Sequence, residues 1–375
     1  MRIVYVAYSD VPGRSAASVH VMRMSQALAD DGHDVVLLAS PSSDVALRGV
    51  SPHEYYGTRP NFRVLHTKHV AIRDIGRLGF ALKCLREIRR FSPGLVYGRE
   101  LLTCCLSVMI GYRTVYEVHH AIHRESALKR ALIGAMVRSK ALQHVVVISE
   151  SLRRSLVEET GVPSHKVIVA HDASDVPAPG LLPASIQDSG GRCNVGYIGS
   201  LHAGKGLEVI EHVAPLARQA FFHIIGGSTQ QVESWKARLA YDNVHFYGHV
   251  RPADVAAYIS AMDICLLPNQ ASVQSRGGSE ISEFTSPLKM FEYMAAAKAV
   301  ICSDLPVLRE VLDDTTAVIV NPTDWTGWAS VIDSLSIDDA RREALGQAAY
   351  RRFAGSYSWR ARSTHVIRSA VDPPS

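Results

Sequence analysis

The stretch CNVGYIGSLHAGKGLE, at residues 193–208, decides the fold because it runs from an apolar strand through a glycine-rich turn into a helix. Its first half is nearly continuously apolar, which is typical of a parallel strand buried on both faces. Its second half follows the pattern GxxxxGK and places Lys205 at the beginning of the helix. Such a turn can present free N–H groups, a positive helix end and a lysine to an anion. We therefore predict phosphate binding at residues 199–206.

Two other interpretations of this turn stay open. A P-loop ATPase would have Ser or Thr after the lysine to hold magnesium, but this chain has Gly206 there and no convincing Walker B strand that ends in Asp. Alternatively, the glycines only permit a tight connection between strand and helix. We prefer phosphate binding because Lys205 lies in the turn itself, where a solvated lysine is not required.

The same alternation of strand and helix extends in both directions from this unit. Apolar runs predict strands at residues 2–8, 34–39, 62–66, 95–98, 114–119, 144–149, 166–170, 193–199, 221–226, 244–248, 263–267, 299–303 and 317–320. Apolar residues at helical spacing predict helices at 18–31, 204–218, 338–354 and 359–370. The distances between the strands suit crossover helices, so we expect a parallel sheet in each half.

Proline and glycine crowd residues 173–192 and interrupt this alternation. We predict a Rossmann-like domain at residues 1–175, a linker at 176–192, and a second Rossmann-like domain at 193–355. The remaining residues, 356–375, form a C-terminal helical segment that could pack back on the first domain. Two open α/β sheets joined in this way predict a ligand-binding cleft at the carboxyl ends of the strands.

The composition is that of an ordinary globular protein. Of its 375 residues 47% are hydrophobic and 20% are charged, and the net charge is only +4, which argues against a dedicated nucleic-acid binder. No run approaches the roughly 20 apolar residues that span a bilayer. The first strand lacks the basic start and the cleavage site of a signal peptide, so we expect a cytoplasmic protein. The six cysteines form no zinc or disulfide pattern.

The charge is divided unevenly between the two halves. Residues 1–171 contain 23 Lys and Arg against 14 Asp and Glu, whereas residues 172–375 contain 17 against 22. Within the basic half, residues 73–90 carry six basic and two acidic residues, with Ile75, Leu78, Leu82 and Leu85 at helical spacing. This segment could touch an anionic membrane surface, or it could be a core-packed helix with a solvated basic face.

A second candidate anion site begins in the stretch SPLKMFEYM, at residues 286–294. Ser286 is expected to cap a helix, Pro287 suits the first helical turn, and Lys289 adds positive charge. Glu292 lies among apolar residues, where a carboxylate requires a polar partner such as a ribose diol. The alternative is a partly exposed glutamate in an ordinary amphipathic helix.

In their order and spacing, these motifs resemble glycosyltransferase family 4, a large group of retaining enzymes with the GT-B fold. The resemblance rests on YIGSLHAGKGLE at 197–208, FHIIGG at 222–227, NVHFYG at 243–248, AMDICLLP at 261–268 and SPLKMFEYM at 286–294. In the first half it rests on Pro12 and Gly13 after the first strand, GHDV at 32–35 and VIS at 147–149, and it extends to YSW at 357–359.

The resemblance implies an α/β protein with two facing Rossmann-like domains, parallel sheets and an interdomain cleft. The second domain would hold a nucleotide-diphosphate sugar, and the first would supply most of the acceptor site. The residues implied for the donor diphosphate are Gly13, Ser200, Lys205, Gly206, Pro287, Leu288 and Lys289. The other implied contacts are Glu292 for the ribose, Gly248, His249 and Val250 for the base, and Glu283, Phe284 and Ser286 for the donor sugar. Lys205 and His119 would be the catalytic residues.

Two departures from the family concern the donor site. The family often has Arg directly after the glycine that corresponds to Gly199, but this chain has Ser200, so His202 or Arg276 would have to replace the missing cation. The family's paired glutamates are separated by seven residues, and counting back from Glu292 gives Phe284, with Glu283 one residue out of step. The identity of the donor sugar therefore stays open.

The sequence thus predicts a retaining hexosyltransferase that moves a sugar from a nucleotide-diphosphate sugar to an acceptor hydroxyl. Because no DxD pair ends an expected strand, we expect neither a metal nor another cofactor. The acceptor would be a saccharide, a lipid-linked molecule or a small molecule of bacterial glycoconjugate, polysaccharide or natural-product biosynthesis. Nucleic acid is not expected as a partner, whereas the protein could lie at the inner face of the cell membrane.

Three alternatives stay open. An epimerase or a hydrolase of nucleotide sugars could share the fold, and a non-catalytic nucleotide-sugar-binding subunit would also retain these motifs. Within the enzyme interpretation, His120 directly follows His119, so either histidine could be the one in the active site.

Overall fold

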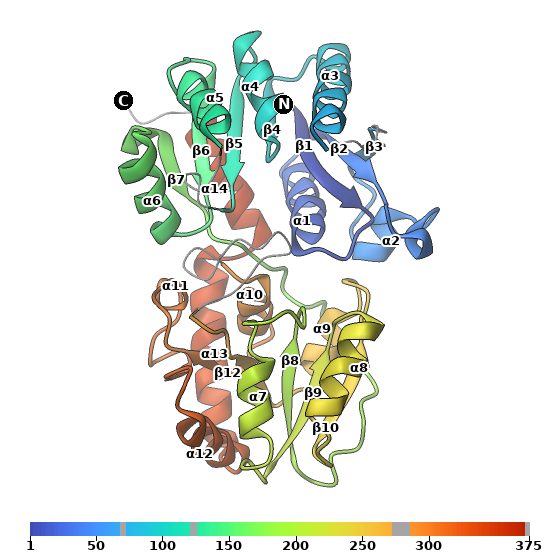
Figure 1. Cartoon of the computed structure of the whole chain (residues 1–375), viewed down its shortest axis with the longest axis vertical. Coiled ribbons are helices and arrows are strands. Elements are labelled where there is room, and N and C mark those ends of the chain that lie inside the picture. The colour runs from blue at the N-terminus through green and yellow to red at the C-terminus, as the bar shows by residue number, and fades with distance from the viewer. Residues whose placement is uncertain (68–72, 121–125, 272–285, 372–375) are drawn as a thin grey trace. The chain divides into compact units, whose positions relative to one another are not determined.

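The computed structural model describes residues 1–67, 73–120, 126–271 and 286–371, and the chain forms two compact units. Unit 1 comprises Met1–Asp172 and Trp359–Ser375, and unit 2 comprises Ala173–Ser358. Each unit contains a parallel β-sheet flanked by helices (Figure 1). The expected α/β architecture with two Rossmann-like sheets is therefore confirmed.

Unit 1 contains a sheet of seven strands in the order β3-β2-β1-β4-β5-β6-β7. The strands are β1 (Arg2–Val11), β2 (Asp34–Pro41), β3 (Arg63–His66), β4 (Leu95–Gly98), β5 (Thr114–Val118), β6 (Leu142–Val147) and β7 (Val167–Val169). The helices are α1 (Ala16–Asp30), α2 (Pro52–Tyr56), α3 (Arg73–Phe91), α4 (Leu101–Met109), α5 (Ala127–Val137), α6 (Glu150–Thr160) and α14 (Trp359–Val371), with short 3₁₀ turns at Val45–Leu47 and Ser164–Lys166.

Unit 2 contains a sheet of six strands in the order β10-β9-β8-β11-β12-β13. The strands are β8 (Cys193–Ile198), β9 (Ala220–Ile225), β10 (Val244–Gly248), β11 (Ile264–Leu267), β12 (Ala299–Ser303) and β13 (Val318–Val320). The helices are α7 (Leu207–Val213), α8 (Thr229–Arg238), α9 (Val255–Ser260), α10 (Leu288–Ala295), α11 (Pro306–Arg309), α12 (Trp325–Ser336) and α13 (Asp339–Ser356).

In each sheet the strand order reverses beside the first strand of the unit, which is β1 in unit 1 and β8 in unit 2. At such a switch point the loops on either side diverge and leave room for a ligand beyond the carboxyl ends of the strands. The loop containing Gly13 follows β1, and the turn that begins at Gly199 follows β8. The topology therefore brings both glycine loops to the positions where an α/β sheet binds ligands.

The last helix belongs to the first unit. Helix α14 lies beside α1 and buries Trp359, Val366, Ile367 and Ala370 (Figure 1). Its Arg362 is buried as well. The chain thus leaves unit 1 after Asp172 and returns to it at Trp359.

Two local expectations were wrong. The helix expected at 204–218 ends at Val213, because Pro215 has no N–H group to continue it. The capping role expected for Ser286 is also wrong, since helix α10 begins at Leu288 with Pro287 at its N-cap. By contrast, all six cysteines are free and buried, as expected.

The basic segment expected at 73–90 forms helix α3, which presents apolar as well as basic side chains to solvent. Leu78 is 48% exposed and Leu82 is 56% exposed, whereas Leu85 is buried. The side chain of Ile75 lies outside the described residues. Among the helices that the structure describes, none is both long enough and apolar enough to cross a bilayer.

Candidate active site

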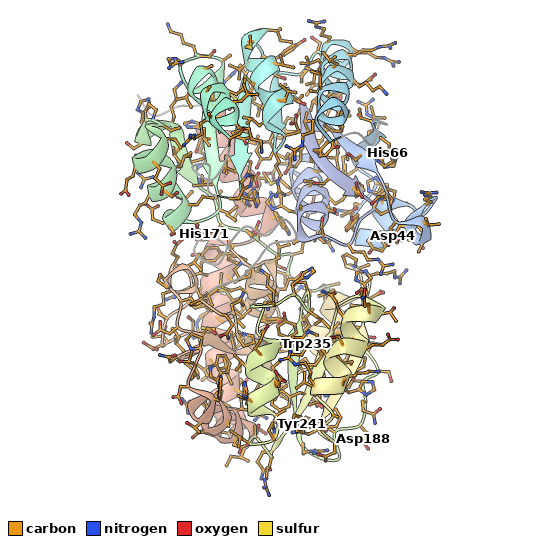
Figure 2. All side chains as sticks on the ribbon, in the orientation of Figure 1. Asp44, His66, His171, Asp188, Trp235 and Tyr241 are labelled. Atoms are coloured by element: carbon orange, nitrogen blue, oxygen red, sulfur yellow. The ribbon has the colours of Figure 1, made fainter. Side chains whose placement is uncertain are left out.

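In unit 2, contacts to neighbouring elements fix the glycine-rich turn after β8. Gly199 donates its N–H to the carbonyl of Ile225 on β9 at 2.9 Å, and the hydroxyl of Tyr197 donates to the carbonyl of Ser200 at 2.7 Å. The indole Nε1–H of Trp235, which Figure 2 labels, donates to the carbonyl of Leu201 at 3.1 Å. The turn therefore has one well-defined conformation at the switch point of the sheet.

Only glycine fits at the end of this turn. Gly206 has a φ of +116°, and a Cβ atom there would lie 2.4 Å from the carbonyl oxygen of Pro268, which follows β11. Gln270 adds a bond in the same region, because its N–H donates to the carbonyl of Gly204 at 2.9 Å. The turn thus packs directly against the segment that leaves the neighbouring strand.

The carboxylate of Glu208 binds backbone N–H groups of the turn that were expected to be free for an anion. Glu208 accepts hydrogen bonds from the N–H groups of Gly204 at 2.9 Å and Gly206 at 3.3 Å. The N–H of Gly206 is therefore not free in this structure, and its contact with the donor diphosphate stays a prediction. Among the described residues, the side chains of two lysines bring positive charge to this turn.

Lys205 and Lys289 bring these two ammonium groups to the same turn. The Nζ atom of Lys289 lies 4.2 Å from the centre of the Tyr197 ring and 3.7 Å from the position that a Cβ atom on Gly199 would take. Burial lowers the pKa of both lysines, and the charge of Lys205 lowers the pKa of Lys289 further, to about 7. The free site therefore disfavours two ammonium charges in a poorly hydrated place, and an anion would stabilise them.

The start of helix α10 lies at this site without a side-chain cap. Pro287 adopts an extended conformation at the N-cap, and Lys289 is the second residue of the helix. The first N–H groups of a helix have no partner within it, so the amides of Leu288 and Lys289 can meet an anion. Ser286, expected beside the donor sugar, is buried just before the cap.

The residues expected around the nucleoside lie in the same unit. Glu292 is half-buried one turn further along α10. Gly248 ends β10 and accepts a hydrogen bond from the N–H of Gly226 at 2.7 Å, whereas His249 is exposed and Val250 half-buried. Glu283, Phe284 and Arg276 lie outside the described residues.

In unit 1, Gly13 lies in the loop after β1 and is fully engaged by one side chain. Its N–H donates to the hydroxyl of Tyr56 at 2.7 Å, and the same hydroxyl donates to the carbonyl of Gly13 at 2.7 Å. A Cβ atom on Gly13 would lie 2.5 Å from the carbonyl oxygen of Asp10. This loop is therefore held closely, and its glycine is required for steric reasons.

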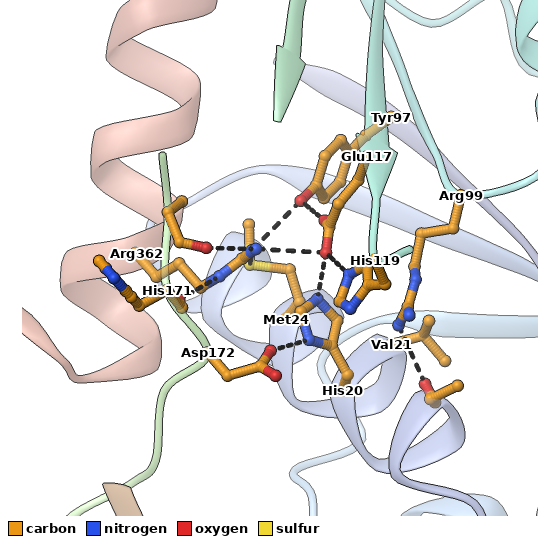
Figure 3. Close-up of polar contacts among 12 residues, drawn as sticks. His20, Val21, Met24, Tyr97, Arg99, Glu117, His119, His171, Asp172 and Arg362 are labelled. Carbon is orange, nitrogen blue, oxygen red and sulfur yellow. Dashed lines mark hydrogen bonds and ion pairs between the residues drawn. The ribbon is translucent and has the colours of Figure 1, made fainter. Parts of the chain in front are cut away.

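His119 directly follows β5 and takes part in a buried polar network (Figure 3). Its Nε2 donates to the Oε1 atom of Glu117, the carboxylate at the centre of the network. The guanidinium of Arg362 donates to the same carboxylate at 3.2 Å, and the hydroxyl of Tyr97 donates to its other oxygen. The neighbouring His120 is exposed, so the structure distinguishes the two histidines by their surroundings.

His20 joins a second carboxylate to this network. Its Nδ1 donates to Asp172 at 2.7 Å, and its Nε2 lies 2.9 Å from Glu117 without the alignment of a hydrogen bond. Arg362 also donates to the main-chain carbonyls of His171 at 2.9 Å and Ala170 at 3.2 Å. The network thus draws together α1, β4, β5, the segment after β7, and α14.

The charges in the network determine the protonation state of His119. Burial would raise the pKa of Glu117, but Arg362 and the two imidazoles outweigh it and hold that pKa well below its ordinary value. Burial and the charge of Arg99 lower the pKa of His119 to about 3. Since an ionised carboxylate can only accept, the proton of the neutral His119 ring must be on Nε2. Its Nδ1 is then a hydrogen-bond acceptor.

Among the described residues, His20, Glu117 and His119 form a group whose ligand atoms lie close enough together to hold a metal ion. The arginines argue against that use. Arg362 already contacts Glu117, and Arg99 is near enough to lower the pKa of His119. Two carboxylates are thus matched by two guanidinium groups, and a divalent cation would add unbalanced charge to a buried site.

Most members of this network were missed in the sequence. Glu117 lies in an apolar strand, and a carboxylate in such a place needs a buried partner, so this signal could have been used. His20, Asp172 and Arg362 offer no such signal, because their partners lie far away along the chain. The sequence placed only His119 at a functional site.

Comparisons with known proteins cover both halves of the chain. A family model described as Glycosyltransferase Family 4 matches residues 17–176, and one described as Glycosyl transferases group 1 matches residues 192–338. The chain is 25% identical to the glycogen synthase of Mycobacterium tuberculosis, an alignment that covers 97% of this chain and 93% of the relative. It is 24% identical to the phosphatidyl-myo-inositol mannosyltransferase of the same organism, with 96% and 93% covered.

Solved structures share the fold over nearly the whole chain. Sucrose-phosphate synthase from Thermosynechococcus elongatus superposes with a TM-score of 0.74 at 15% identity, covering 98% of both chains. Anabaena HepE, solved in complex with UDP-glucose, superposes with a TM-score of 0.72 at 15% identity, covering 98% of this chain and 99% of HepE. These similarities show the GT-B fold.

Proposed function

Because the chain belongs to glycosyltransferase family 4, we propose that it transfers a sugar from a nucleotide-diphosphate sugar to an acceptor hydroxyl with retention of anomeric configuration. The observation that carries this proposal is the pair of half-buried lysines beside the uncapped start of α10. Within the part of the chain that the structure describes, the Nζ atom of Lys289 is buried without a hydrogen-bond partner, and Lys205 lies in the glycine-rich turn nearby. A leaving diphosphate supplies the negative charge that such a site lacks.

In this proposal the protein accelerates transfer by stabilising the departing diphosphate. Two ammonium groups and the first amides of α10 are already oriented where negative charge develops, so little reorganisation is needed during the reaction. We favour attack of the acceptor on the same face, with the diphosphate taking up the acceptor's proton. Glu117, the carboxylate beside His119, is held by Arg362, Tyr97 and His119 and is not free to act as a nucleophile.

His119 is proposed to orient the donor sugar. Glu117 fixes its proton on Nε2, so Nδ1 accepts a hydrogen bond and suits a sugar hydroxyl, which can donate one. The half-buried Glu292 on α10 is proposed to hold the ribose. Both assignments rest on the position of these residues in the family motifs and on their surroundings in each unit.

The names of similar proteins suggest which donors and acceptors to test first. HepE was solved with UDP-glucose, and other relatives are named for glycogen synthesis and for mannosyl transfer to phosphatidyl-myo-inositol. UDP-linked hexoses are therefore the first donors to test, and hexoses linked to other nucleoside diphosphates complete the panel. Saccharides, lipid-linked molecules and small molecules are the acceptor classes.

Catalysis is proposed to need no divalent metal. The two lysines and the start of α10 supply the positive charge that a magnesium ion would bring to the diphosphate. Turnover should therefore persist after extensive chelation with EDTA. Loss of turnover that is restored by Mg²⁺ or Mn²⁺ would show that the leaving group is stabilised in another way.

The proposed function is tested by incubating the purified protein with a panel of nucleotide-diphosphate hexoses and acceptors. Release of nucleoside diphosphate together with a glycosylated acceptor, in the same anomeric configuration as the donor, supports it. An epimerised donor or free sugar alone would favour an epimerase or a hydrolase. Donor binding without turnover across the panel would favour a non-catalytic subunit.

We also propose that the protein contacts a membrane surface through helix α3. This helix exposes Leu78 and Leu82 beside Arg77, Lys83 and Arg86. Exposed leucines between basic residues can insert at the surface of an anionic bilayer. A lipid-linked acceptor would be found at that surface.

A further inference from the structure

Lys289 is an unusual lysine because its ammonium group is buried and has nothing to bind. Its Nζ atom is enclosed without a hydrogen-bond donor or acceptor among the described residues. A buried charge of this kind is costly unless a partner is supplied. Among the described residues, Tyr197 is the one whose aromatic ring lies close to this ammonium group. The centre of that ring is 4.2 Å from Nζ.

Among the described residues, no group around Lys289 supplies a compensating charge at hydrogen-bonding distance. Lys205, from the glycine-rich turn, opposes its protonation, and Glu292, one turn along its own helix, favours it less strongly. Glu208, on α7, already accepts from the amides of Gly204 and Gly206. Tyr197 on β8 and Tyr293 on α10 have pKa values raised by burial, so both phenols stay neutral.

These surroundings lower the pKa of Lys289 to about 7, chiefly through burial. Near pH 8.5 the side chain is therefore mostly an uncharged amine in the empty site. A dianionic phosphate placed at the start of α10 would reverse this preference, because a charge-assisted hydrogen bond to an ammonium becomes available. Ser200 cannot provide such a bond, since a hydroxyl carries no positive charge.

We propose that Lys289 takes up a proton from solvent when a nucleoside diphosphate binds, and so becomes the second cation of the donor site beside Lys205. This inference rests on the proposed function, since it requires a diphosphate at the start of α10. The proton goes from the buffer to Nζ and returns when the product leaves, with no covalent step. Binding of the nucleoside diphosphate thus produces the positive charge on Lys289 that stabilises its phosphates.

The proposal also predicts how affinity depends on pH. Protonation of Lys289 is part of binding above its free pKa, so binding should weaken as the pH rises. Between about pH 7.5 and about pH 8.5, the dissociation constant for a nucleoside diphosphate should rise by nearly tenfold. The β-phosphate titrates near about pH 6, so it contributes no proton in this range.

The experiment is isothermal titration calorimetry of the full chain with UDP and GDP as probes, at about pH 8.5, in buffers that differ in ionisation enthalpy. The observed enthalpy should vary with the buffer in proportion to an uptake of close to one proton per site. Near pH 7, where about half of the Lys289 side chains are already charged, the uptake should fall to about half a proton per site. Neither readout depends on catalytic turnover.

Three variants provide the matched tests and controls. Lys289→Met should bind the diphosphate more weakly and take up no proton, whereas Lys289→Arg should bind without uptake because arginine is always charged. Lys205→Met should weaken binding and keep a smaller uptake, because loss of the Lys205 charge raises the pKa of Lys289. Circular dichroism checks that each variant is folded, and the wild-type buffer series stands by itself if a variant is not.

The outcomes separate this inference from the proposed function. Binding of UDP or GDP without proton uptake in the wild type would overturn the role of Lys289 and leave the donor site standing. Uptake that persists in Lys289→Met would likewise overturn it. No binding of either nucleotide, together with no turnover in the donor panel, would count against the proposed function itself.

Discussion

Lys205 lies in the turn after β8, where burial lowers its pKa and an anionic ligand would stabilise its charge. Replacing it with methionine keeps most of the side chain's volume and removes the charge. A charge-assisted bond to a phosphate is worth about 1.5–3 kcal/mol, so kcat/KM should fall by roughly 10- to 200-fold. Steady-state kinetics at limiting donor checks this, once a donor is identified.

The control is Lys236→Met, on the exposed face of α8. It removes the same charge from unit 2 away from the turn and should leave kcat/KM nearly unchanged. Equal activity of Lys205→Met and the wild type would mean that Lys205 is not a phosphate ligand.

His119 makes the stability of unit 1 depend on pH. Its pKa is about 3 in the folded protein and about 6.5 in an unfolded chain, so only the unfolded state binds its proton between these values. The stabilisation is fully present above about pH 6.5 and is lost as the pH falls towards 3. Between about pH 7 and about pH 5, His119→Asn should lose roughly 1–2 kcal/mol less stability than the wild type.

Urea unfolding at the two pH values measures this difference. His165→Asn, at an exposed histidine, serves as the control and should follow the wild type. The same pH dependence in His119→Asn and the wild type would mean that His119 is readily protonated in the fold, and its assignment as a hydrogen-bond acceptor would then fail.

At the scale of elements, helix α3 is the candidate for membrane contact. Its two exposed leucines are flanked by basic residues, and each should add apolar burial in a bilayer surface. Replacing Leu78 and Leu82 together with serine should weaken binding to vesicles of anionic phospholipid by about tenfold or more. Co-sedimentation across a salt series measures it, since salt screens the basic residues.

Leu182→Ser is the comparison, because Leu182 is exposed in unit 2 and outside the basic half. It should bind vesicles as the wild type does. Failure of the wild type to sediment with anionic vesicles at any salt concentration would exclude this role of α3.

The elements were easier to predict than their partners. Parallel strands buried on both faces are continuous apolar runs, so the strands of both sheets were visible in the sequence. The boundaries of helices were harder to predict, because they depend on single residues. Pro215 ends α7 earlier than expected, and Pro287, not Ser286, is the N-cap of α10. The lysines were found because a positive residue beside a helix start follows a local pattern.

The network around Glu117 could not be predicted in the same way. Its members come from distant parts of the chain, and Arg362 is separated from Glu117 by 245 residues. A buried carboxylate indicates that some partner exists, but nothing local shows which arginine it is. Equally, the capture of two amides by Glu208 depends on the conformation of the turn.

At the scale of the whole molecule, α14 should be essential for unit 1. A chain that ends at Ser358 lacks the buried residues of α14 and leaves Glu117 without Arg362. Removing one partner of a buried ion pair costs about 3–5 kcal/mol, and the lost apolar contacts add to this. We expect unit 1 to unfold while unit 2 stays folded, which limited proteolysis with mass spectrometry can show.

Arg362→Met in the full chain tests the ion pair without removing the helix. It should lower the stability of unit 1 and spare that of unit 2. If the truncated chain kept a protease-resistant unit 1, α14 would be a peripheral attachment and not part of that unit's core.

The return of the chain to unit 1 also governs the order of events during synthesis. A ribosome completes every residue of unit 2 before it makes the helix that finishes unit 1. Unit 1 therefore cannot complete its fold until α14 has been synthesised, and until then Glu117 and the face of α1 that packs against α14 stay uncovered. Unit 2 can fold during this interval. Nascent unit 1 is thus the stage at which this protein should depend most on chaperones.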